Sequence, residues 1–110
     1  MLRCTVTYGG SARTIDTLAG NDPYTAEAVD IDGRFLFKAV VRGDRNRITL
    51  VRLYVYQPTA RQPRLLHDAR YLPPFAEASG PFGLTGDQTV YAMPLERQLH
   101  YGCALVRGAA

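Results

Sequence analysis

Residues 24–56 constrain the fold of this chain more than any other stretch, because they consist of three β-rich runs separated by two turn signals. The first turn signal is Asp32-Gly33. An Asp-Gly pair between apolar runs is typical of a β-hairpin with a type I′ turn, in which both central residues need a positive φ. The stretch therefore predicts an antiparallel meander of three strands.

The turn type also predicts a register for the first hairpin. A two-residue loop pairs Ile31 with Arg34, and the same register places Glu27 opposite Lys38. Opposite charges on facing residues stabilise a sheet by about 0.2–1 kcal/mol. We therefore expect Glu27 and Lys38 to form a cross-strand pair.

The second hairpin is constrained by its apolar faces. In the middle run one face is entirely apolar, with Phe35, Phe37, Ala39 and Val41. For Val51, Leu53 and Val55 of the next run to share that face, the loop between the runs needs an odd number of residues, or a β-bulge, since a slip by one residue exchanges the two faces of a strand. We expect one of these devices at residues 43–46.

Alternation of apolar and polar residues predicts strands along most of the remaining chain, at residues 3–8, 11–18, 64–71, 88–93 and 97–106. The run at 64–71 also has features of a short helix, but its flanking prolines and short length favour a strand that places Leu65, His67, Ala69 and Tyr71 on one face. Residues 72–87 form a long loop, and its Phe75 and Phe82 are expected to anchor it to the core.

Length and strand spacing indicate the fold class. A chain of 110 residues is the size of one domain, here 1–110. About eight short strands with turn signals every eight to twelve residues predict an all-β fold, an antiparallel β-sandwich, with a small closed β-barrel as the alternative. Tyr101-Gly102-Cys103 is similar to the Tyr-x-Cys of immunoglobulin domains, but the buried Trp of that family is absent, so the resemblance implies a similar architecture only.

The two cysteines, Cys4 and Cys103, lie near opposite ends of the chain on apolar strand faces. They have no metal-ligand spacing, which argues against a zinc site. We expect a disulfide between the first and last strands, and two buried reduced thiols are the alternative. A disulfide would indicate a periplasmic or secreted protein whose leader has been removed, and reduced thiols a cytoplasmic one. No apolar stretch approaches the ~18–20 residues of a membrane helix.

Charge and motifs argue against several functions. The net charge is only +3 and all but one of the 13 basic residues are Arg, whereas a dedicated nucleic-acid binder has a larger, clustered excess. The sequence Asp30-Ile31-Asp32-Gly33 matches the start of a calcium loop, but apolar residues follow it, so turn chemistry explains it better. We predict no metal site, no cofactor and no enzymatic activity.

One surface is a candidate for binding a protein partner. Arg52, Tyr54 and Tyr56 alternate with the core residues of their strand, and Tyr and Arg are enriched in binding hot spots. The chain is therefore predicted to be a small non-enzymatic β-sandwich module that binds a macromolecular partner or serves a structural role. The alternative for this face is that the rest of the fold covers it, or that it is a solvated face with residues that favour β-structure.

Two further functions stay open. In a barrel that binds single-stranded nucleic acid, the two tyrosines would stack on bases while Arg42, Arg47 and Arg52 contact phosphates. In an enzyme, His67 or His100, the only two histidines, would act in catalysis, although the chain has no G-x-S-x-G nucleophile motif.

Overall fold

The computed structural model of the chain describes residues 1–21, 27–44, 46–76, 80–93 and 97–106. These residues contain eight β-strands and no helix, which confirms that 64–71 is a strand. The strands are β1 (Leu2–Tyr8), β2 (Ser11–Thr17), β3 (Val29–Ile31), β4 (Phe35–Gly43), β5 (Ile48–Gln57), β6 (Arg64–Tyr71), β7 (Gln88–Ala92) and β8 (Arg97–Leu105).

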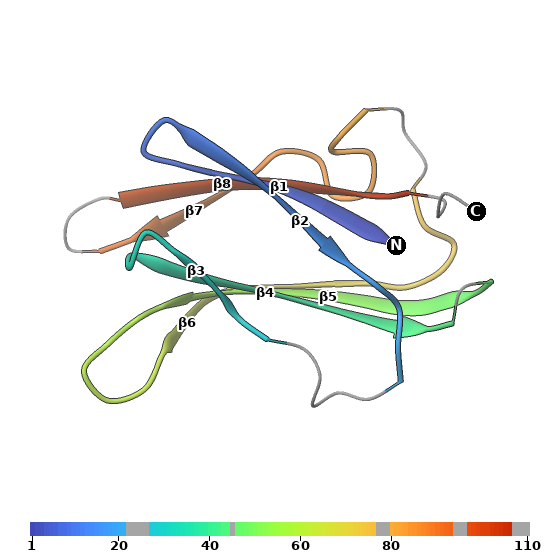
Figure 1. Cartoon of the computed structure of the whole chain (residues 1–110), viewed down its shortest axis with the longest axis horizontal. Coiled ribbons are helices and arrows are strands. Elements are labelled where there is room, and N and C mark those ends of the chain that lie inside the picture. The colour runs from blue at the N-terminus through green and yellow to red at the C-terminus, as the bar shows by residue number, and fades with distance from the viewer. Residues whose placement is uncertain (22–26, 45, 77–79, 94–96, 107–110) are drawn as a thin grey trace.

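The strands form two antiparallel sheets of four that pack face to face (Figure 1). One sheet has the order β2-β1-β8-β7 and contains both the first and the last strand, and we call it the terminal sheet. The other has the order β3-β4-β5-β6, in which every strand pairs with its sequence neighbour, and we call it the meander sheet. The predicted β-sandwich is confirmed, and the closed barrel is wrong. Within the described ranges there is no helix long and apolar enough to span a membrane.

The core lies between the sheets and consists of the alternating faces that the sequence predicted. All the predicted apolar residues of β4 and β5 are buried, and Phe35, Phe37 and Leu53 have no exposed surface. Aromatic contacts connect the two sheets, because the ring centroid of Phe37 lies 5.4 Å from that of Tyr101. The inward residues of the terminal sheet are Leu2, Cys4, Val6, Val90, Ala92, Leu99, Tyr101 and Cys103.

The first turn has the predicted type but not the predicted register. Asp32 and Gly33 have φ angles of 53° and 68°, and the amide of Arg34 donates to the Ile31 carbonyl over 3.0 Å, as in a type I′ turn. Ile31, however, lies opposite Phe35 rather than Arg34. Directly opposed residues share a face, so the predicted register would have placed Ile31 beside Arg34 on the outer face. The observed register keeps Ile31 buried.

This shift also removes the predicted pair of Glu27 and Lys38. The first strand of the meander begins only at Val29, so Glu27 lies outside the sheet and is exposed. Residues 24–26 of the predicted run lie outside the described residues. Lys38 therefore has no cross-strand carboxylate from β3.

The second turn confirms the predicted change of phase and uses the bulge. Val41 pairs with Val51 and Arg42 with Leu50, but Gly43 then pairs with Ile48, so one residue of β5 is extra. Gly43 has a φ of 121°, and a Cβ there would overlap the backbone carbonyl of Arg47. Only glycine fits such a close approach of two backbones.

A second bulge corrects the predicted face of β6. Val55 pairs with His67 but Tyr56 pairs with Leu65, so Leu66 is the extra residue. His67, Ala69 and Tyr71 keep the predicted inward face, whereas Leu65 points outward and is 51% exposed. Bulges of this kind turn one side chain over without changing the rest of the strand.

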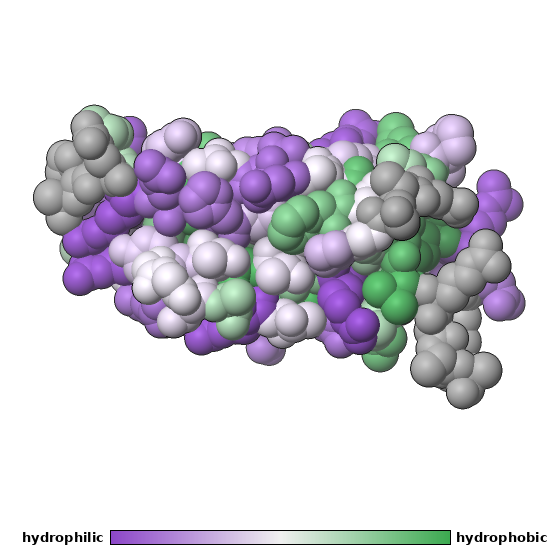
Figure 2. All heavy atoms as spheres, turned by 90° about the horizontal axis from the view of Figure 1, so that it is seen from above, coloured by the Kyte–Doolittle hydropathy of each residue, from purple (hydrophilic) through white to green (hydrophobic). Residues whose placement is uncertain are grey.

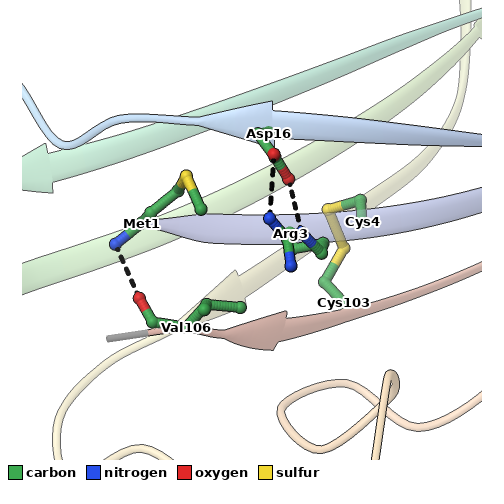
Figure 3. A network of polar contacts seen from close by, with 6 residues as sticks. All are labelled: Met1, Arg3, Cys4, Asp16, Cys103 and Val106. Atoms are coloured by element: carbon green, nitrogen blue, oxygen red, sulfur yellow. Dashed lines mark hydrogen bonds and ion pairs between the residues drawn. A yellow bond between two sulfur atoms is a disulfide. The ribbon is translucent and has the colours of Figure 1, made fainter. Parts of the chain in front are cut away.

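The disulfide between Cys4 and Cys103 joins neighbouring strands of the terminal sheet, not the two sheets as in immunoglobulin domains (Figure 3). The two residues are directly opposed, with a Cα–Cα distance of 4.1 Å, just below the expected range of about 4.4–6.8 Å. The amide and carbonyl of Cys103 bond instead to Thr85 and Leu84 on its other side. The cysteines thus form a non-hydrogen-bonded pair, the closer of the two kinds in an antiparallel ladder.

Two further contacts hold β1 in place. The amino terminus of Met1 donates to the Val106 carbonyl over 3.2 Å, and Arg3 forms an exposed ion pair of 2.9 Å with Asp16 on β2 (Figure 3). The first strand is therefore fixed on both sides along its whole length.

The long loop before β7 covers part of the outer face of the terminal sheet. The ring of Phe82 packs directly on Gly102 at this face, whereas Leu84 and Thr85 lie beside β8, where they bond to the backbone of Cys103 and Leu84 joins the core. Phe75 packs against the core as predicted, whereas Phe82 lies on the outside of the sheet. Figure 2 views this face from above: polar side chains cover much of it, and hydrophobic ones gather toward the end where the loop crosses.

Candidate functional site

Strand alternation places the predicted surface residues on the outer face of the meander sheet. In β5 the residues Val51, Leu53 and Val55 have no exposed surface. Arg52 and Tyr54, which alternate with them, point the other way and are partly exposed, and so is Tyr56. The rest of the fold therefore does not bury the surface that the sequence singled out.

These three side chains form a ladder along β5. The guanidinium carbon of Arg52 lies 5.0 Å from the centre of the Tyr54 ring, a cation–π geometry. The Tyr54 and Tyr56 rings are stacked, with centroids 6.1 Å apart and an angle of 19° between their planes. Arg52 and Tyr56 lie two residues before and after Tyr54, so they contact it from opposite sides.

Strand β4 completes a shallow hollow beside the ladder. The register places Lys38 opposite Tyr54, Val40 opposite Arg52 and Arg42 opposite Leu50. The hollow has a volume of about 480 Å³ and is lined by these residues together with Tyr56. We call this surface the Arg–Tyr face, and it consists of Lys38, Val40, Arg42, Leu50, Arg52, Tyr54 and Tyr56.

Strand β6 holds the arginine of the ladder. Nη2 of Arg52 lies 3.0 Å and 3.3 Å from the two carboxylate oxygens of Asp68, which is directly opposite Tyr54. Its Nε is shielded from solvent and has no hydrogen-bond partner within the described part of the chain. Contacts with Asp68 and Tyr54 thus restrain the Arg52 side chain before any partner binds. The side chain therefore loses less conformational entropy on binding.

The tyrosine at the end of the ladder is neutral, as its ordinary pKa of about 10 already ensures. Desolvation raises the pKa of Tyr56 above its usual value, the nearby Tyr54 and Asp68 add to this, and Arg52 opposes it. The hydroxyl of Tyr56 therefore remains a hydrogen-bond donor at every physiological pH.

The two histidines do not meet. His67 Nε2 lies 2.6 Å from the hydroxyl of Tyr101 between the sheets, and burial lowers the pKa of His67. His100 follows the inward-facing Leu99 by one residue and so points to the outer face of the terminal sheet, where its Nδ1 lies 3.0 Å from the Thr89 hydroxyl. The terminal sheet separates the two rings, so they cannot contribute to one site.

Sequence reasoning missed three residues around the ladder: Lys38, Asp68 and Arg70. The incorrect hairpin register assigned Lys38 a partner on β3, which hid its position beside Tyr54. The loop or bulge expected at residues 43–46 already keeps the apolar residues of β4 and β5 on one face. That arrangement alone places Lys38 on the same outer face as Tyr54. The predicted phase of β6 placed Asp68 and Arg70 on the outer face, but no register between β5 and β6 was predicted, so their positions opposite Tyr54 and Arg52 were missed.

A second hollow, of about 460 Å³, opens between the edges of β2 and β4 and includes Ile15, Phe37 and Val41 in its lining. The sequence offered no signal for it, because its walls come from strands of different sheets. Its lining continues to Gly20 and Glu27, next to residues 22–26, which lie outside the described residues. We assign no ligand to this hollow.

The described residues contain no group of three or more His, Cys, Asp or Glu side chains placed to hold a metal ion. At the predicted calcium-like sequence, Asp30 accepts a hydrogen bond of 3.1 Å from the amide of Gly33, which is turn chemistry. Comparison with known proteins finds no match to this chain among family models, curated proteins or solved structures.

Proposed function

We propose that this protein is a non-enzymatic binding module that contacts a macromolecular partner through the Arg–Tyr face. The observation that supports this most is the ladder of Arg52, Tyr54 and Tyr56 beside a hollow. Binding hot spots are rich in Tyr and Arg that are partly buried before binding and become fully desolvated in the complex. The ladder consists of these residue types, and its side chains are partly buried in the free protein.

We also propose that the protein works outside the cytoplasm, in the periplasm or as a secreted protein. The disulfide between Cys4 and Cys103 is compatible with this location, because such bonds persist in oxidising compartments and are rare in the cytosol. Thiol titration of the denatured protein, isolated without reductant, tests the bond. Two free thiols per chain would remove the main reason for this location.

Affinity capture tests the binding face. The wild-type protein and a Tyr54→Ser/Tyr56→Ser double variant are immobilised and exposed to an extract of cells that produce the protein. Tyr91→Ser is the matched control, because Tyr91 is 60% exposed and lies on β7 of the other sheet. We expect a partner that the wild type and the control retain equally and that the double variant loses about 30-fold or more, the effect of one hot-spot residue at about 2 kcal/mol.

The same comparison separates the other possible functions. Equal capture by the double variant and the wild type would show that the Arg–Tyr face does not bind, and would leave a structural role. Tyrosine-dependent, salt-sensitive binding to a single-stranded oligonucleotide would favour the nucleic-acid function instead. Hydrolysis of a test substrate that is lost in His67→Ala or His100→Ala would favour an enzyme.

A further inference from the structure

The Arg–Tyr face and its neighbours on β3 and β6 carry a concentrated positive charge. Lys38, Arg42, Arg52 and Arg70 contribute four positive charges, and Asp68 and the outward-facing Asp30 of β3 contribute two negative charges. The resulting +2 is most of the formal net charge of +3 of the entire chain. On this side of the sandwich the charges therefore do not cancel, whereas on the terminal sheet Arg3 is neutralised by Asp16.

Three of these cations, Lys38, Arg42 and Arg70, form no ion pair with a carboxylate among the described residues. Asp68 already pairs with Arg52. Lys38 and Arg42 lie on the same face of β4, four residues apart, which corresponds to about 13 Å along a strand. Both line the hollow, and between them lies the apolar side chain of Val40, with Leu50 opposite Arg42.

The ladder geometry distinguishes between classes of polyanion. A nucleic-acid base binds an aromatic residue by stacking on a free ring face. Arg52 and Tyr56 flank Tyr54 along the strand, which restricts the stacking of a base on the Tyr54 ring. Besides the far ring face of Tyr56, the ladder offers a partner hydroxyl groups and ring edges, which suit hydrogen bonds and side-chain packing in a protein interface. A second copy of this chain is disfavoured, because two positively charged faces repel each other.

We infer that the Arg–Tyr face binds an acidic protein segment, whose carboxylates pair with Lys38 and Arg42 and whose apolar side chain packs into the hollow on Val40 and Leu50. This inference rests on the proposed binding function and adds the chemistry of the partner. Complementary charge of this kind speeds association and selects against wrong partners.

The probes are a random copolymer of glutamate and tyrosine, poly-L-glutamate, and single-stranded oligo-dT of matched charge, each labelled with a fluorophore and titrated with the folded protein. We expect the copolymer to bind most tightly, because it alone supplies both carboxylates and apolar groups. Its affinity should fall with added salt, since exposed charges are screened.

Two double variants with the same net charge locate the site. Lys38→Gln/Arg42→Gln should weaken copolymer binding by about 4- to 25-fold, since each exposed ion pair changes a dissociation constant by about two- to fivefold. Arg34→Gln/Arg61→Gln removes two exposed charges from turns and should change the affinity by less than about twofold. Lys38→Gln alone serves if the first double variant has a lowered melting temperature.

Three results would overturn the inference: no copolymer binding, equal weakening in both double variants, or oligo-dT binding at least as tightly as the copolymer. None of these decides the proposed function, because affinity capture with the tyrosine variants tests it without any assumption about charge. If the double tyrosine variant captures as much partner as the wild type, both proposals are rejected. Tyrosine-dependent capture with no copolymer binding would reject only the acidic partner.

Discussion

The two sheets of the sandwich differ in how they are held and in what they expose. The terminal sheet pairs the first strand with the last, is closed by a disulfide between residues 99 positions apart, and has a loop packed on its outer face. The meander sheet pairs only sequence neighbours and has no disulfide. Its outer face keeps a partly exposed Arg–Tyr ladder beside a hollow.

The difference follows from the cost of closing loops. Joining strands at opposite ends of a chain costs more conformational entropy than joining neighbours through a short turn. The disulfide and the other contacts that hold β1 lie in the terminal sheet, where this entropic cost is highest. The meander forms locally, so its outer face can carry polar and aromatic residues suited to binding rather than to folding.

The largest expected effect concerns the core side of the meander. Phe37→Ala should reduce the free energy of unfolding by about 3–5 kcal/mol, because it removes a fully buried ring that packs on Tyr101. Leu36→Ala, on the opposite and partly exposed face, should cost about 1 kcal/mol or less. Urea denaturation measures both, and similar losses would contradict the assignment of the two faces.

The next effect concerns the terminal sheet. Cys4→Ala/Cys103→Ala should reduce stability by about 2–5 kcal/mol, because the bond closes a long loop in the unfolded chain. Hydrogen exchange should show lower protection of amides in β1 and β8 than in β4 and β5. Uniform loss of protection in all strands would show that the meander does not fold independently of the disulfide.

A glycine tests the covered face of the terminal sheet. Gly102→Ala would place a Cβ inside the ring of Phe82, and we expect a loss of about 1–3 kcal/mol as the loop moves away. In the background of Phe82→Ala the same change should cost much less. A double-mutant cycle from thermal melts measures this coupling, and strict additivity would show that the two residues do not interact.

The smallest effect links the two sheets through His67 and Tyr101. Burial lowers the pKa of His67 below its ordinary value of 6.5, with the charge of Asp68 opposing, so the unfolded chain takes up this proton at a higher pH than the folded protein. The contribution of neutral His67 to stability should therefore be fully present above its ordinary pKa. It should decrease as the pH falls, by at most about 1.4 kcal/mol per pH unit for one proton.

His67→Gln supplies the control for this prediction. Glutamine can still hydrogen-bond the Tyr101 hydroxyl but does not titrate, so the additional loss at acidic pH should disappear. Denaturation midpoints of both proteins between about pH 8 and pH 5 make the comparison over the range in which histidine titrates. Parallel curves for the two proteins would assign the acid sensitivity to other groups.

Most of the secondary structure could be predicted from the sequence, and the site only in part. Alternation identified the strands and the inward faces of β4 and β5, and it placed Tyr54 and Tyr56 on the outer face. The partners of the ladder were less accessible. Lys38 was assigned to Glu27 by an incorrect register, and the position of Asp68 opposite Tyr54 depends on the register between β5 and β6, which no local pattern indicates.

The sequence by itself determined features that depend on neighbouring residues, such as the strands, the type I′ turn at Asp32-Gly33 and the apolar faces. Only the tertiary structure decided the register after that turn, the two bulges, and the position of Cys103 beside Cys4 in one sheet. The physical reason is that local chemistry sets the conformation of a turn, whereas burial between the sheets decides which side chains point inward. At Ile31 the two requirements conflicted. Burial of Ile31 in the core decided the register, and Arg34 is therefore not paired with a residue of β3.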